Sequence, residues 1–212
     1  MHIISFSASI IFLVAYLFST ILLFNKDNSD AKFDFRNHFA YELFIKKDRN
    51  NFVLNLLLLL SALLFTLNFI LFAVSYFNVI NLVSAIFSVI ISFSLMVLFY
   101  LPLNKLRERC IFSIIFAVAI TMLNALLVFQ SVNMIKQLEE KLVLIPIVVN
   151  ALILIVGIFT IFNPQLFNFD MKRNEDGTLE RPKYITLAFF EWLLILSFLF
   201  SQIYIVMFPL LK

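Results

Sequence analysis

Glycine, histidine and cysteine are all scarce in this chain of 212 residues. Its two glycines, Gly157 and Gly177, are isolated, so the chain has neither a phosphate-binding P-loop nor a dinucleotide-binding fingerprint. Its two histidines, His2 and His38, cannot form a zinc-protease motif, and we expect no metal site and no cofactor. The single cysteine, Cys110, excludes an intrachain disulfide.

Charged residues are also scarce, at 14% of the chain, whereas hydrophobic residues make up 63%. A soluble domain carries roughly 25% charged residues, so a soluble globular fold is excluded. The lipid bilayer must surround most of this chain. The net charge is +3, but the basic residues lie in short stretches between apolar runs. No basic run or aromatic platform indicates a nucleic-acid partner.

Six apolar runs are each long enough to cross a bilayer, which needs about 20 helical residues. They predict a polytopic all-α membrane protein with a single domain over residues 1–212. Only Pro146 lies well inside a run, near its start, so we expect mostly continuous helices. The expected spans are 3–24, 52–77, 79–101, 111–135, 142–163 and 184–208.

The basic residues between these runs are distributed unevenly. Thirteen lie in the connections 25–51, 102–110 and 164–183, which fall on one side of the membrane if all six runs span it. The other three, Lys136, Lys141 and Lys212, lie on the opposite side. The positive-inside rule therefore predicts that these three connections are cytoplasmic and that both termini lie outside. We expect an integral protein of a bacterial cytoplasmic membrane, with an organellar membrane as the alternative.

The connection after the first run contains a stretch, 34–47, in which apolar residues recur at helical spacing. The pattern predicts a helix in the cytoplasmic membrane interface, with its basic end near anionic headgroups. Such a helix would be either a membrane-surface connector or a docking site for a cytoplasmic partner. The candidate interface residues are Phe35, Phe39, Leu43, Phe44, Lys46 and Lys47.

Glu191 is an acidic residue inside a run long enough to span the membrane. A charge near a helix centre costs about 2.5–3.5 kcal/mol, so Glu191 is a candidate functional residue. One interpretation is a protonated glutamate hydrogen-bonded to Asn68 or Asn124. The other is coupling to a proton or cation, substrate binding, or contact with a partner's cation. The candidate intramembrane polar site is Glu191, Asn68, Asn124, Asn150 and Gln202.

We found no catalytic motif, so we expect no enzymatic activity. Runs of small and polar residues at four-residue spacing favour close helix packing. The first hypothesis is a non-catalytic subunit or scaffold of a membrane complex, with a membrane-protein partner or a second copy of the chain. The alternatives are a small permease or channel, proton- or cation-linked through Glu191, and a membrane immunity or defence protein.

The predicted orientation can be tested by labelling single cysteines in a chain that lacks Cys110. A membrane-impermeant maleimide added from outside should modify Leu138→Cys and spare Gly177→Cys, because the two positions lie in connections of opposite predicted side. The reverse pattern would invert the orientation.

Overall fold

The computed structural model describes residues 2–27, 33–36, 38–39, 52–100, 106–138, 143–167 and 185–211. No described residue belongs to a strand, and six helical stretches are long and apolar enough to cross a membrane. The prediction of an all-α protein with six spans is therefore confirmed. The helices are α1 (His2–Asp27), α3 (Phe52–Ser75), α4 (Val79–Tyr100), α5 (Leu106–Leu138), α6 (Leu144–Ile161), α7 (Pro164–Phe167), α8 (Thr186–Phe200) and α9 (Ile203–Leu211).

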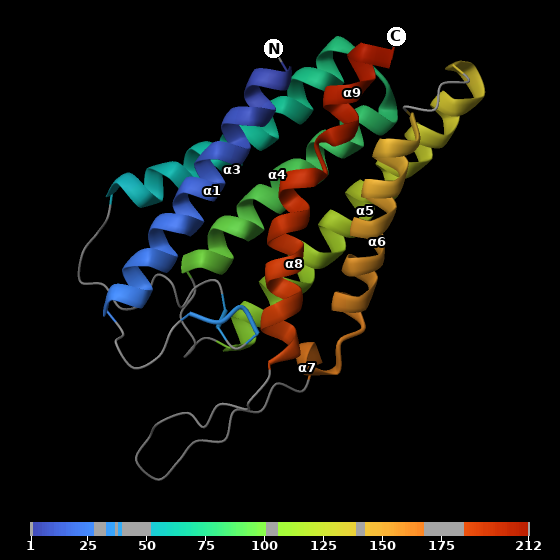
Figure 1. The fold of residues 1–212 in the computed structure, drawn as a ribbon. Helices are drawn as coiled ribbons and strands as arrows, with labels where there is room; N and C mark the ends of the chain where they lie inside the picture. The colour runs from blue at the N-terminus through green and yellow to red at the C-terminus, as the bar shows by residue number, and fades with distance from the viewer. Residues whose placement is uncertain are drawn as a thin grey trace.

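The long helices run alternately in opposite directions, so both chain ends lie at the same end of the bundle (Figure 1). We call this the upper end, and the end with α7 and the first turns of α5 and α8 the lower end. The lower end is the one predicted to be cytoplasmic. That orientation stays a prediction from the basic residues.

The α8–α9 stretch is the central element of the bundle. The first five long helices pack in chain order, α1 on α3, α3 on α4, α4 on α5 and α5 on α6. The α8–α9 stretch contacts four of them, α1, α3, α5 and α6. In the most apolar part of this stretch 56% of the residues are buried, against 22% for α1. Phe65 of α3 stacks on Phe198 of α8 with ring centroids 4.1 Å apart. A large side chain of α3 therefore packs directly on α8.

The sixth span, Thr186–Pro209, is long enough to cross a membrane but contains one local irregularity. It divides into α8 and α9 at a turn formed by Ser201 and Gln202. The Ser201 hydroxyl donates to the Phe198 carbonyl at 3.0 Å. A serine side chain that binds the preceding helical turn competes with the backbone and bends helices. Proline does not mark this turn, because Pro209 lies beyond it, inside α9.

The pair α5 and α6 packs closely at Gly157. A Cβ atom built at Gly157 would lie 1.9 Å from Oγ1 of Thr121 on α5. That hydroxyl also donates to the Ala117 carbonyl at 2.6 Å. A residue without a side chain lets the two helix backbones approach at this point.

We expect Gly157→Ala to lower the free energy of unfolding by about 1–3 kcal/mol, because the added methyl group clashes with the Thr121 hydroxyl. Adding Thr121→Ala should recover most of this loss, because it removes the clashing hydroxyl. The nearest side-chain atom that remains, Cβ of residue 121, lies 3.1 Å from the new methyl group. Denaturant unfolding in detergent measures both effects, with Thr121→Ala alone as the control. Unchanged stability of Gly157→Ala would show that the helices do not meet here.

Candidate functional site

The side chain of Glu191 forms a buried ion pair with Arg109. Glu191 lies in the second turn of α8 and Arg109 in the first turn of α5, and both helices begin at the lower end. Arg109 Nη2 lies 2.6 Å from Oε1 and 2.8 Å from Oε2 of Glu191. The two side chains are only 4% and 3% exposed. The carboxylate is therefore held by a cation of its own chain.

Arg109 also joins α4 to this pair. Its Nη1 donates to the carbonyl of Leu98 at 3.2 Å. Leu98 lies in the last turn of α4, where carbonyls have no partner within the helix and the helix dipole favours a positive charge. The guanidinium also lies over the ring of Phe39, with Cζ 4.9 Å from the ring centroid. One cation therefore binds α4, α8 and the connection after α1.

The described part of that connection, residues 33–36 and 38–39, is here called the capping segment. Phe35 and Arg36 form a turn, and none of the described residues of the segment is helical. The rest of the helix predicted over 34–47 lies outside the described residues, so that prediction stays untested. The Asp34 carboxylate accepts a hydrogen bond from the Arg36 backbone N–H at 2.9 Å. The Asp34 carbonyl also accepts a hydrogen bond from the His38 N–H at 2.9 Å, so Asp34 closes this turn through both its side chain and its backbone.

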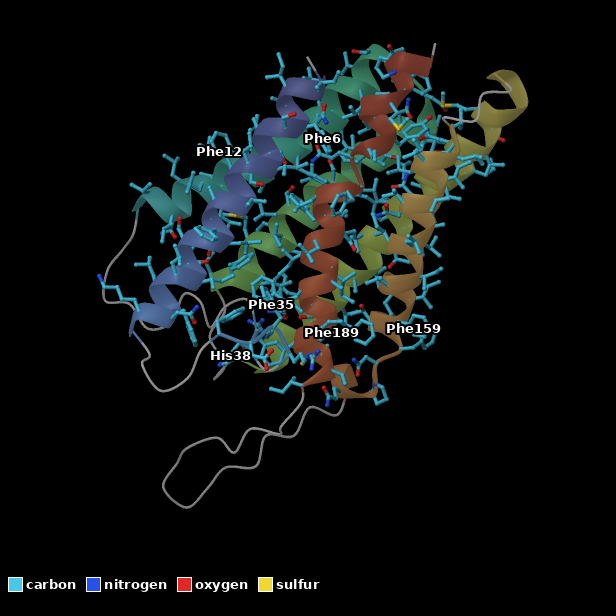
Figure 2. All side chains as sticks on the ribbon, viewed as in Figure 1. Phe6, Phe12, Phe35, His38, Phe159 and Phe189 are labelled. Carbon is cyan, nitrogen blue, oxygen red and sulfur yellow. The ribbon has the colours of Figure 1, made fainter. Side chains whose placement is uncertain are left out.

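The capping segment is attached to the start of α8 through its backbone. The Ile185 N–H donates to the Arg36 carbonyl at 3.0 Å. The Trp192 indole N–H donates to the His38 carbonyl at 2.7 Å. Phe35 and His38 lie beside the lower part of α8 (Figure 2). Trp192, which holds the capping segment, directly follows Glu191, which forms the ion pair, so both contacts come from the same turn of α8.

Aromatic rings fill the space between the capping segment, α1 and α8. Phe33 and Phe35 contact Trp192 edge-on, with ring centroids 5.6 Å and 5.2 Å from it. Phe24, near the end of α1, packs edge-on against His38 at 5.2 Å. Such ring pairs add about 0.5–1.5 kcal/mol each beyond the area they bury. The predicted membrane-surface connector is thus, in its described part, a packed cap on the bundle.

Only two of the six candidate interface residues, Phe35 and Phe39, are described, and they differ in exposure. Phe35 is 48% exposed, whereas Phe39 is 2% exposed and lies against Arg109. The other four candidates lie outside the described residues: Leu43, Phe44, Lys46 and Lys47.

Two of the candidate polar residues, Asn68 and Gln202, form a hydrogen bond with each other. Asn68 of α3 donates to Gln202 Oε1 at 2.9 Å, and Gln202 Nε2 donates to the Ser9 hydroxyl of α1 at 3.3 Å. All three residues are fully buried. Gln202 follows Glu191 by eleven positions, which corresponds to roughly 16 Å along a helix axis. This contact is therefore a second polar layer, separate from the ion pair.

The remaining two candidates, Asn124 and Asn150, are fully buried on α5 and α6. Asn124 donates to the Ile120 carbonyl of its own helix at 2.7 Å. Neither amide atom of Asn150 has a hydrogen-bond partner in the described structure. An unsatisfied buried amide costs about 1–3 kcal/mol. The five predicted polar residues are thus not one site. Of the two glutamate partners suggested from sequence, Asn68 donates to Gln202 and Asn124 to its own helix, whereas Glu191 binds Arg109.

Arg109 is the site residue that sequence reasoning missed. It was counted among the loop charges because its connection was expected to extend to residue 110. The helix α5 instead begins at Leu106, so Arg109 lies inside the bundle. Two features of the sequence indicate Arg109 as a partner of Glu191: it lies directly before an apolar run, and a carboxylate inside the membrane needs a cation. Among the described residues, no three His, Cys, Asp or Glu side chains gather in a way that could hold a metal ion.

We expect Glu191→Gln to lower the free energy of unfolding by about 3–5 kcal/mol, because it leaves the Arg109 charge buried without its carboxylate. The double variant Arg109→Met with Glu191→Leu should recover most of the loss, since it removes both charges. Glu108→Gln is the matched control, because Glu108 adjoins Arg109 but is exposed. Detergent unfolding curves measure all three, and wild-type stability of Glu191→Gln would contradict the pairing.

Comparison with known proteins gave no match to this chain, whether against protein-family models, curated proteins or solved structures.

Proposed function

We propose that this multi-pass membrane protein is a non-catalytic subunit or scaffold of a membrane complex. The observation that carries the proposal is the pairing of Glu191 with Arg109 inside the same chain. An acidic residue that couples transport to protons needs access to water and freedom to change partners. Glu191 is buried and bound through both oxygens to one arginine nitrogen. Its role is better explained as joining helices.

Other polar side chains in the membrane also join helices. The Ser61 hydroxyl of α3 donates to the Ser9 carbonyl of α1 at 2.9 Å. Thr66 of α3 and Ser92 of α4 share a hydrogen bond of 2.8 Å, and Ser92 also donates to the Ala62 carbonyl at 3.1 Å. Interhelical hydrogen bonds of this kind hold transmembrane bundles together. These contacts support a protein whose intramembrane polar side chains hold its own helices together.

The outer helices offer apolar surface to another membrane protein. On α1, the exposed residues Ile4, Ile11 and Phe18 recur every seven positions and so form one stripe. On α6, Val148 and Phe159 are more than half exposed, and Phe159 lies at the outer side of the helix (Figure 2). Either lipid or a partner helix covers such stripes. The scaffold proposal assigns these stripes to a partner's helix or to a second copy of the chain.

A permease is the second candidate, and the break between α8 and α9 favours it. Discontinuous helices in transporters often bind substrate or ions near the middle of the membrane. Here the break carries Gln202, which binds Asn68 and Ser9. If the protein is a permease, the solute would pass beside Gln202, Asn68 and Ser9, and Glu191 would have a structural role.

The two functions are separated by native mass spectrometry after gentle extraction from the source membrane, with a tag inserted after Gly177. The scaffold proposal predicts a stoichiometric second protein, or a defined homo-oligomer, bound to the tagged chain. A lone monomer would contradict it. If that monomer also gives solute flux in liposomes, and Gln202→Leu abolishes the flux while the control Thr160→Val does not, the permease is favoured instead.

A further inference from the structure

The lower end of the bundle contains a pocket of about 350 Å³ beside the start of α8. Its described lining consists of Arg36 of the capping segment together with Ile185, Thr186, Phe189 and Phe190. The volume falls within the range of ligand pockets, roughly 300–1,000 Å³. Because the sixth span begins at Thr186, the pocket lies where the apolar part of the membrane meets the headgroups.

Arg36 has a fixed backbone and an exposed position. Its N–H donates to the Asp34 carboxylate at 2.9 Å, and its carbonyl accepts from the Ile185 N–H at 3.0 Å. Within the described part of the chain, the Arg36 guanidinium forms neither an ion pair nor a hydrogen bond. An anchored backbone reduces the ordering that ligand binding requires. Arg36 is therefore placed to bind an anionic group at the start of α8.

Thr186 supplies a hydroxyl to the same pocket. Its Oγ1 accepts a hydrogen bond from Asn163 Nδ2 at 3.3 Å, and the residue is exposed. A threonine hydroxyl has one proton to donate in addition to its acceptor lone pairs, so Thr186 can still donate to a ligand. Guanidinium and hydroxyl donors together suit the oxygens of a phosphate group. Among the described lining residues there is no Asp or Glu that would bind the cation of a zwitterionic headgroup.

The other described side chains of the pocket are apolar. Phe189 lies on the lower part of α8 (Figure 2) and is 42% exposed. Its ring packs edge-on against that of Phe190, with ring centroids 5.9 Å apart. A free phosphate ion gains nothing from such a surface, whereas the acyl chain of a lipid makes dispersion contacts with it. The pocket therefore matches an anion that carries an apolar chain.

We propose that this pocket binds one anionic phospholipid from the leaflet at the lower end. The lipid phosphate accepts from the Arg36 guanidinium and the Thr186 hydroxyl, and an acyl chain packs on Phe189 and Phe190. Basic pockets beside transmembrane helices bind anionic lipid headgroups, and the lower end is the one predicted to face the cytoplasm, where the leaflet is anionic. The assignment is independent of the scaffold function, because it uses only this surface.

The chain has one tryptophan, Trp192, which can report a lipid bound here because it follows Phe189 by three positions, within one helical turn. The purified full chain is reconstituted in phosphatidylcholine vesicles that contain a fraction of lipid with brominated acyl chains, which quench tryptophan fluorescence at short range. The brominated lipid is either phosphatidylglycerol, which is anionic, or phosphatidylcholine. We expect phosphatidylglycerol to bind beside Trp192 about fivefold or more tightly. Inorganic phosphate, compared with chloride at equal ionic strength, should leave the quenching unchanged.

A matched pair of variants locates the site. Arg36→Gln removes the charge in the pocket, whereas Lys26→Gln removes an exposed charge in the last turn of α1, outside the described lining. Arg36→Gln should lower the preference for phosphatidylglycerol to less than about twofold, and Lys26→Gln should leave it unchanged. If Arg36→Gln does not fold, Thr186→Val removes the other phosphate donor and should also lower the preference.

Four results would each overturn the assignment. They are equal quenching of the wild-type protein by the two brominated lipids, an unchanged preference in a folded pocket variant, an equal loss of preference in Arg36→Gln and Lys26→Gln, and displacement of the lipid by inorganic phosphate.

Discussion

The lower half of this molecule depends on one buried ion pair. Arg109 and Glu191 lie where water cannot solvate either charge, so each requires the other. The guanidinium also binds the Leu98 carbonyl and packs on Phe39, which brings α4 and the capping segment to the same point. Trp192 extends the arrangement by holding His38. A single charge in α8 therefore determines how three helices and a connecting segment meet.

The α8–α9 stretch connects this ion pair to a second polar layer higher in the bundle. Gln202 binds α3 through Asn68 and α1 through Ser9. Between Glu191 and Gln202 along this stretch, Phe198 stacks on Phe65 of α3. Directional bonds at two levels fix the rotation of the central helix, while apolar packing fills the space between them. This division explains why the intramembrane polar residues do not converge on one site.

Much of the fold could be predicted from sequence, because bilayer thickness imposes a length on every apolar run. Arg109 was missed because hydropathy places the start of its helix at the apolar run, whereas α5 begins at Leu106 and so includes the arginine. Of the helix predicted over 34–47, only residues 34–36 and 38–39 are described; they form a single turn that Asp34 closes with its side chain, a bond that the apolar spacing does not indicate. The turn before α9 escaped notice because a serine, and no proline, accompanies it. In each case the deciding interaction is a polar bond that hydropathy does not register.

The ionisation of Glu191 is the most direct test of this account. Infrared difference spectra of the wild-type chain against Glu191→Gln, in lipid at neutral pH, separate a carboxylate from a protonated acid. Because the arginine guanidinium stays charged, the account predicts a carboxylate band in the wild type that Glu191→Gln removes. It also predicts a protonated-acid band once Arg109→Met has removed the cation. A protonated-acid band in the wild-type protein would contradict the ion pair on which the account depends.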